Sequence, residues 1–271
     1  MAFLHLRGVS KGFDTSNGRL SVLADVNLEV EEGEFVSIVG GSGSGKTTIV
    51  SLIAGLIEPD AGELRLDGKE IRGPGPERGV VFQNYSLLAW MTVLENVQLA
   101  VDAVCRDLTR AQRRHRAEGL VRMVHLGGAM HKKPRELSGG MRQRVAVARG
   151  LAMNPRVLLL DEPFSALDAL TRVSLQDELA RIWLRERKTV VLITNDVDEA
   201  ILLSDRIHPL SSGPGARLGP PIHVDLPHPR VRRHLSLDPR YQSARRALVA
   251  YLMQRRNGCE AAPDFPMAVA S

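Results

Sequence analysis

The run from Gly40 to Thr47 is the first group of residues whose types and spacing suit a defined chemistry. It reads Gly-Gly-Ser-Gly-Ser-Gly-Lys-Thr and fits the pattern G-x-x-x-x-G-K-[ST]. Its glycines allow successive backbone N–H groups to turn inward around phosphate oxygens. In this pattern Lys46 reaches the β- and γ-phosphates, and Thr47 offers its hydroxyl to Mg²⁺. We therefore predict a nucleotide site built from Gly40, Gly41, Ser42, Gly43, Ser44, Gly45, Lys46, Thr47 and Thr48.

A pair of carboxylates, Asp161 and Glu162, forms the second group. Asp161 is predicted to hold Mg²⁺, directly or through water, because a hard cation prefers oxygen ligands. Glu162 is then the candidate that polarises an attacking water molecule. The alternative is an exposed acidic turn before Pro163, and the phosphate loop upstream favours the chemical interpretation.

Both groups require strands and helices that bring them together. The apolar runs 35–39 and 49–53 flank the phosphate loop, in the strand, turn and helix order that its pattern requires. The new helix adds the positive end of its dipole to the phosphate site. The apolar run 157–160 predicts a strand buried on both faces of a parallel sheet. Because ligands bind at the carboxyl ends of such strands, we expect the two carboxylates beside the phosphates.

A third motif, Leu-Ser-Gly-Gly-Met-Arg-Gln at 137–143, completes a set that resembles the ATP-binding subunits of ATP-binding-cassette transporters. The resemblance covers nearly all of residues 3–210. Members of that family place Leu-Ser-Gly-Gly at a helix start, where it caps the γ-phosphate of ATP held by the opposite subunit. The resemblance thus assigns nucleotide contacts to Ser138, Gly139 and Gly140 and implies a head-to-tail dimer with two ATP molecules. A serine with two glycines at a helix start makes an anion nest, although it is also an ordinary helix cap.

Three further site residues follow from the resemblance alone. Phe13 matches the aromatic residue that stacks on adenine, with simple core packing as its alternative. Gln83 matches the glutamine that touches Mg²⁺ and the water while its loop senses the membrane partner. Asp168 matches a residue of the loop that crosses between subunits and aligns the two sites.

Asn195 departs from the family pattern, which usually has a histidine that contacts the γ-phosphate at this position. Asparagine donates a neutral hydrogen bond but cannot become cationic or shuttle a proton. A charge-assisted bond is worth roughly 1.5–3 kcal/mol against about 1 kcal/mol for a neutral one. The difference predicts hydrolysis slower by roughly 2- to 30-fold. The alternatives are a partner subunit that carries the usual histidine, and a subfamily that tolerates asparagine.

The resemblance and the landmarks together predict an α/β fold: a P-loop nucleotide-binding core, a flanking antiparallel β subdomain and a helical subdomain. Alternating residues at 3–33 predict the antiparallel strands. The predicted boundaries are 1–85 and 136–221 for the core with its β subdomain, and 86–135 for the helical subdomain, which is followed by the signature motif at 137–141. Residues 222–271 are a C-terminal extension, partly helical, with one helix expected at 239–254.

Composition is compatible with a soluble, cytosolic chain. The 271 residues are 44% hydrophobic, and no apolar stretch approaches the roughly 18 residues that span a bilayer. Cys105 and Cys259 are isolated, which fits a reducing compartment. The net charge of +5 includes a basic segment at 106–118 without interleaved aromatics, so we predict solvated helix faces and no nucleic acid partner.

Residues 80–90 and 161–172 look like the importer branch for nitrate, sulfonate and taurine, and 84–88 with 195–206 look most like its nitrate group. This resemblance implies an ATPase that powers nitrate or nitrite import through a separate membrane permease. It also implies a periplasmic binding protein, a second ATPase subunit and a peripheral location at the cytoplasmic face of the inner membrane. The alternatives are a sulfonate or taurine importer and a hydrolysis-impaired regulatory subunit. Candidates for receiving the permease, or for simple lobe packing, are Tyr85, Leu87, Leu88 and Trp90.

Overall fold

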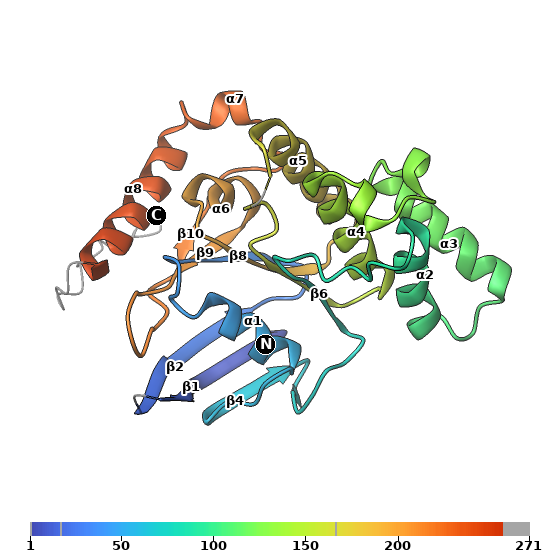
Figure 1. Cartoon of the computed structure of the whole chain (residues 1–271). Coiled ribbons are helices and arrows are strands. Elements are labelled where there is room, and N and C mark those ends of the chain that lie inside the picture. The colour runs from blue at the N-terminus through green and yellow to red at the C-terminus, as the bar shows by residue number, and fades with distance from the viewer. Residues whose placement is uncertain (1, 17, 166, 257–271) are drawn as a thin grey trace.

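Two β-sheets organise the chain in the computed structural model, which describes residues 2–16, 18–165 and 167–256 (Figure 1). Cys259 and the end of the predicted extension lie outside the described residues. The larger sheet has the order β10-β9-β3-β8-β7-β6, and the smaller one is antiparallel with the order β2-β1-β4-β5. The large sheet comprises β3 (Phe35–Val39), β6 (Arg78–Val81), β7 (Val157–Asp161), β8 (Thr189–Thr194), β9 (Arg206–Pro209) and β10 (Ile222–His223). The small sheet comprises β1 (Leu4–Thr15), β2 (Gly18–Val30), β4 (Ala61–Leu66) and β5 (Lys69–Glu70).

The central strands are buried on both faces, which explains their unbroken apolar sequences. In β7, Val157 and Leu159 belong to the core cluster that faces the small sheet, whereas Leu158 and Leu160 belong to the cluster on the opposite side. Successive side chains of a strand point to opposite faces, so an apolar residue is needed at every position of such a strand. Strands β6, β7, β8, β3 and β9 pair in parallel, and the predicted α/β class is confirmed.

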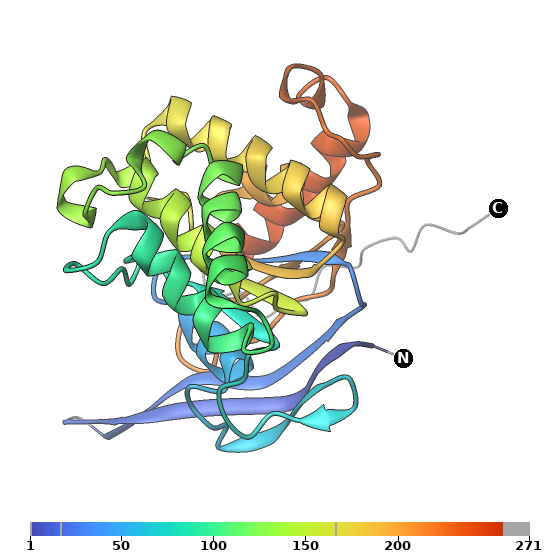
Figure 2. The ribbon, with the colours of Figure 1, turned by 90° about the vertical axis from the view of Figure 1, so that its right-hand side faces the viewer.

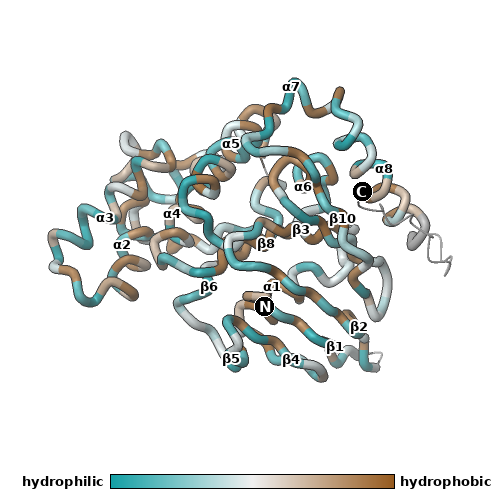
Figure 3. Tube along the Cα trace, turned by 180° about the vertical axis from the view of Figure 1, so that it is seen from behind, coloured by the Kyte–Doolittle hydropathy of each residue, from teal (hydrophilic) through white to brown (hydrophobic). Residues whose placement is uncertain are grey.

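Helix α1 (Lys46–Ala54) lies between the two sheets (Figures 1 and 2). Its Ile49, Leu52 and Ile53 are buried with inward-facing residues of β1, β2 and β4. Along these strands brown and teal alternate in Figure 3, as expected for a sheet with one buried face. The small sheet therefore packs against α1 and fixes its position. The phosphate loop runs into the first turn of this helix.

The other face of the large sheet is covered by α4 (Gly139–Ala152) and α5 (Ala169–Glu186), and α2 (Val93–Val104) and α3 (Arg110–Met123) pack against α4 beside the sheet. Helices α2 and α3 both begin with a capping box, in which the threonine at the N-cap and the acidic or amide side chain three residues later exchange hydrogen bonds. The surface of α3 is strongly hydrophilic in Figure 3. Several of its arginines pair with carboxylates, namely Arg113 with Asp102, and Arg114 and Arg122 with Glu118.

The described part of the C-terminal extension, 222–256, contains β10, α7 (Arg232–Leu235) and α8 (Pro239–Arg256). The helix predicted at 239–254 is thus present and two residues longer. Its buried residues Ala244 and Leu248 pack with α6 (Val197–Leu203) and with Val224 and Leu226 in a third core cluster. Among the described residues, no helix combines the length and the apolar character that a membrane crossing requires.

Candidate nucleotide-binding site

The carboxyl ends of three neighbouring parallel strands bring the predicted chemical groups to one edge of the large sheet. Val39 at the end of β3 pairs with Thr194 at the end of β8, and Asp161 at the end of β7 pairs with Ile193. The phosphate loop, the two carboxylates and the loop containing Asn195 follow these strand ends directly. This arrangement is the one expected of ligand sites in open α/β sheets.

Lys46 is held inside the phosphate loop. Its Nζ donates to the carbonyl oxygens of Gly40 at 2.9 Å and Gly41 at 2.7 Å, and it lies 3.2 Å from Glu162 Oε1. Only 4% of the residue is exposed. Gly45 forms the N-cap of α1 with φ of 93°, and a Cβ there would lie 2.9 Å from a side-chain atom of Leu23 and from one of Val22. Glycine is therefore required at position 45, where the phosphate loop turns into α1 immediately before Lys46.

Asp161 and Thr47 are in contact beside the phosphate loop. Thr47 Oγ1 donates to Asp161 Oδ1 over 3.3 Å. Asp161 is buried, which excludes the exposed acidic turn considered above. Burial raises the pKa of Asp161 above its usual range; the hydrogen bond from Thr47 acts against that rise, and the neighbouring charge of Glu162 adds to it. Ser44 Oγ is also buried here and has no hydrogen-bond partner among the described residues. The carboxylate of Asp161 and the hydroxyl of Thr47 are oxygen ligands of the kind that Mg²⁺ prefers, and the hydroxyl of Ser44 can donate to a phosphate oxygen.

Glu162 adopts a left-handed backbone conformation with φ of 45°, which is uncommon for a residue other than glycine. Its backbone N–H donates to the carbonyl of Ile193 over 2.9 Å, so the turn after β7 is tied to β8. The side chain of Glu162 borders a pocket of about 100 Å³. The pocket is also lined by Phe164, Ser165, Arg172, Thr194, Asn195, Asp196 and Glu199.

Glu199 is a residue of this pocket that the sequence did not single out for the site. It lies in the first turn of α6 and is only 5% exposed. Burial raises the pKa of Glu199 to about 7, although hydrogen bonds from Thr194 and Gln176 oppose the rise. An acidic residue in a first helical turn is an ordinary helix-start signal, so nothing in the local sequence distinguishes this carboxyl group from a surface one.

Gln83 and Phe13 are both exposed to solvent. Gln83 is exposed after β6, whose neighbour in the sheet is β7, and its Nε2 lies 3.5 Å from Ser165 Oγ. Phe13 lies near the tip of the β1–β2 hairpin and is 41% exposed, which argues against the core-packing alternative. The ammonium group of Lys11 lies 5.6 Å from the centroid of the Phe13 ring.

The signature motif and Asp168 both cap helices. Ser138 is the N-cap of α4, and its Oγ accepts from the N–H of Met141 over 3.3 Å. Asp168 caps α5 by accepting from the N–H of Thr171 over 3.0 Å. Hydrogen bonds from the side chain and then the backbone of Thr171 lower the pKa of Asp168. A Cβ on Gly140 would lie 2.2 Å from a methyl carbon of Thr171, so glycine is needed where α4 approaches α5. Ser138 and Asp168 are exposed at these helix starts.

Comparison with known proteins decides the family. The sequence profile described as "ABC transporter" matches residues 23–165. The chain belongs to the ABC transporter family. It is 48% identical over 254 residues to the nitrate transport protein NasD of Klebsiella oxytoca, and the match covers 93% of this chain and 97% of NasD. It is 49% identical over 255 residues to the bicarbonate transport ATP-binding protein CmpC of Synechococcus elongatus. That match covers 94% of this cassette but only 38% of CmpC.

Solved structures support the same assignment. A dimeric post-hydrolysis structure of the ATP-binding cassette MJ0796, bound to ADP and Pi, superposes on this cassette with a TM-score of 0.74. The two sequences are 33% identical, and the alignment covers 82% of this chain and 99% of that one. The predicted cassette fold and the predicted kinship with nitrate-type ATP-binding proteins are therefore confirmed, and bicarbonate-type proteins belong to the same set of relatives.

Proposed function

We propose that this cassette hydrolyses ATP to power the import of a small anion, nitrate in the first place, through a separate membrane permease. The observation that carries the proposal is the meeting of Lys46, Asp161 and Glu162 at one sheet edge. The nitrate assignment is supported by the 48% identity to NasD along nearly the whole length of both chains. Bicarbonate is the second candidate, because CmpC is 49% identical over a smaller share of its own length.

In this proposal the phosphate loop binds the triphosphate. The backbone N–H groups of Gly41 to Thr48 surround the β- and γ-phosphates, and Lys46 Nζ exchanges its carbonyl and Glu162 contacts for phosphate oxygens. Thr47, Asp161 and Gln83 are the residues that would hold Mg²⁺. The ion, when bound, neutralises phosphate charge.

Glu162 is the proposed general base. The residue has a left-handed backbone after β7, and its side chain lines the pocket shared with Asn195. Glu162 Oε1 would accept the proton of a water molecule that attacks the γ-phosphate, while the amides of Gln83 and Asn195 orient the water and the phosphate.

Two copies of the cassette complete each site in this proposal. Ser138 is exposed and Gly139 is partly exposed at the start of α4, whereas Gly140 is buried against Thr171. In the proposal this helix start presents its N–H groups to a γ-phosphate on another subunit. Asp168 aligns the two subunits from the start of α5, and Phe13 stacks on adenine from its exposed position on β1. A partner subunit would be a second copy or a homologue.

The loop after β6 is the proposed permease contact. Tyr85 and Ser86 are both left-handed, with φ of 63° and 46°, and the guanidinium of Arg149 donates to both of their carbonyl oxygens. Tyr85 packs against the helical core, whereas Trp90 is 69% exposed. A rigid loop that ends in an exposed indole suits the binding of a partner helix. Such binding would place the cassette at the cytoplasmic face of the membrane, with a periplasmic binding protein delivering the anion to the permease.

Replacing Asn195 with histidine is expected to raise turnover by roughly 2- to 30-fold, because imidazolium would make a charge-assisted bond to the γ-phosphate. The gain should shrink as the pH rises through about 6.5, where an unperturbed imidazole loses its proton. Steady-state ATPase assays between pH 5.5 and 8.5 measure both effects. Asn154→His, on the exposed turn before β7, is the matched control. Unchanged turnover in Asn195→His would remove the idea that Asn195 limits hydrolysis.

The anion is identified by ATP turnover of the cassette reconstituted with its permease in liposomes. Binding protein loaded with nitrate, bicarbonate, taurine or an alkanesulfonate is added in parallel. We expect the largest stimulation with nitrate, and none when the binding protein is empty. Stimulation by bicarbonate alone would transfer the assignment to that anion, and stimulation by none of the four would contradict the proposed import of these anions.

A further inference from the structure

The short helix α6 follows Asn195 directly, and the C-terminal extension holds its first turn. Tyr241 of α8 donates its hydroxyl hydrogen to Asp198 Oδ1 over 2.7 Å, and Arg245 Nε donates to the same oxygen over 2.8 Å. Asp198 lies three positions after Asn195. Helix α8 therefore contacts the first turn of α6, the helix whose N-cap directly follows Asn195.

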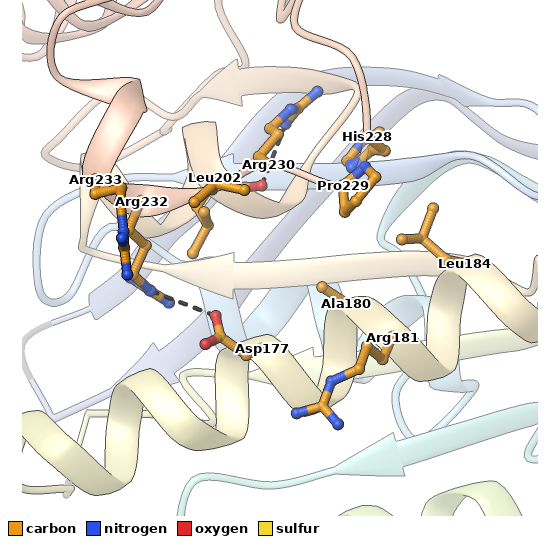
Figure 4. A pocket seen from close by; sticks show the side chains of 11 residues that line it. Asp177, Ala180, Arg181, Leu184, Leu202, His228, Pro229, Arg230, Arg232 and Arg233 are labelled. Carbon is orange, nitrogen blue, oxygen red and sulfur yellow. Dashed lines mark hydrogen bonds and ion pairs between the residues drawn. The ribbon is translucent and has the colours of Figure 1, made fainter.

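The same extension also holds the last turn of α6. Arg230 donates to the carbonyl oxygens of Ile201 and Ser204, each over 2.7 Å, and more weakly to that of Leu202 (Figure 4). Its remaining N–H groups donate to carbonyls of its own segment, at Val224 and Leu226. A guanidinium at the carbonyl end of a helix is electrostatically favourable. Residues of the extension thus form hydrogen bonds with both ends of helix α6.

A third connection reaches the hydrolysis pocket through α5. Arg232 Nη2 donates to Gln176 Oε1 over 2.5 Å, and Gln176 Nε2 donates to Glu199 Oε2 over 2.5 Å. Gln176 is 2% exposed, so it has no room to find other partners. Arg232 also pairs with Asp177 on the wall of a surface pocket (Figure 4). These contacts form a continuous chain from the extension to a carboxyl group that borders the same pocket as Glu162 and Asn195.

We propose that Glu199 is a positioning residue for ATP hydrolysis, and that Gln176 and Arg232 hold it so that the C-terminal extension sets the position of Asn195. The inference rests on the proposed placement of Asn195 beside the γ-phosphate. The side chain of Glu199 accepts from Gln176, and its backbone is linked to the loop after β8. Its N–H donates to Asp196 Oδ1 over 3.0 Å, and the N–H of Asp196 donates to Thr194 Oγ1 over 3.0 Å.

The charged neighbours of Glu199 explain why its position matters. Arg172 Nη1 lies 3.8 Å from Asp196 Oδ2, and both residues line the pocket with Glu199 and Glu162. A buried carboxyl group that loses the amide of Gln176 must find another donor, because an unsatisfied buried group is costly. Arg172 is the cation within the pocket. A turn of Glu199 toward Arg172 would disturb the Arg172–Asp196 pair and shift the loop that holds Asn195.

The test is a swap of the two side chains in the 271-residue chain. Gln176→Glu places a second carboxyl group against Glu199, and we expect kcat to fall about 10- to 100-fold, as misplacement of a positioned group does. The KM for ATP should stay within about twofold, because the phosphate loop is untouched. The double variant Gln176→Glu/Glu199→Gln should restore kcat to within about threefold of wild type. In that variant residue 176 accepts from both Arg232 and the amide at 199.

Two further variants keep the test decisive. Glu178→Gln is the matched control on α5, since Glu178 pairs with His125 and Arg181 outside this chain of contacts, and it should leave kcat unchanged. Arg232→Met breaks the chain at its outer end, so it serves if Gln176→Glu does not fold, and we expect kcat to fall about 2- to 10-fold.

The outcomes separate this inference from the proposed function. Wild-type kcat in Gln176→Glu or, where that chain does not fold, in Arg232→Met would overturn the coupling alone. A loss that the swap does not restore, accompanied by a parallel fall in Tm, would reduce the contacts to packing and would also overturn it. Absence of turnover in wild type would contradict the proposed function and this inference with it.

Discussion

Replacing Glu162 with glutamine is expected to lower ATP turnover by about 10²- to 10⁴-fold, the contribution of a positioned general base. Glutamine keeps the shape of the side chain that lies 3.2 Å from Lys46, so the phosphate loop should keep its structure. ATP binding should therefore be retained. Because bound ATP is no longer hydrolysed, we also expect an ATP-dependent dimer to accumulate, visible as a shift in light-scattering mass on adding ATP.

The matched control for this change is Glu63→Gln on β4, where Glu63 pairs with Arg65 on the small sheet. It should hydrolyse ATP at the wild-type rate. Normal turnover in Glu162→Gln would exclude Glu162 as the general base. Loss of ATP binding together with turnover would instead assign Glu162 to holding Lys46.

Replacing Lys46 with methionine is expected to weaken ATP binding by about 10- to 150-fold, the equivalent of one charge-assisted hydrogen bond of roughly 1.5–3 kcal/mol. Methionine has a similar length and suits a buried position, so the loop should not collapse. Hydrolysis should fall below detection, because the developing charge on the γ-phosphate loses its nearest cation. Calorimetric titration with ATP and with ADP measures the binding loss.

Lys188→Met provides the control, since Lys188 contacts Asn154 and Glu186 at the opposite end of β8 from Asn195. Its ATP affinity should equal that of wild type. If Lys46→Met binds ATP as tightly as wild type and only turnover falls, the lysine acts in the transition state and not in ground-state binding.

Local sequence predicted the phosphate loop and the strand ends well, for physical reasons. A glycine turn between an apolar strand and a helix has few alternative conformations, and an apolar run with no alternation is stable only in a sheet covered on both faces. Val157–Asp161 shows both the buried strand and the carboxyl group at its end, as expected. The antiparallel strands and the last helix were likewise readable from the spacing of their apolar residues.

Contacts between distant segments could not be predicted in this way. Gln176, Glu199 and Arg232 lie on three different helices, and each has an unremarkable sequence context. Their meeting depends on how α5, α6 and the extension pack against the large sheet. The need for glycine at position 140 has the same origin, because the methyl group that would clash belongs to Thr171 of α5. Such features follow from tertiary packing and leave no periodic signal.

Mixing two inactive variants tests most directly whether two subunits build each ATP site. Lys46→Met lacks a working phosphate loop, and Ser138→Arg lacks a working signature motif, so each chain alone should be inactive. In an equal mixture we predict about a quarter of wild-type turnover, because half of the dimers are mixed and each mixed dimer has one intact site of two. A mixture as inactive as its components, or full turnover by Ser138→Arg alone, would contradict the shared site.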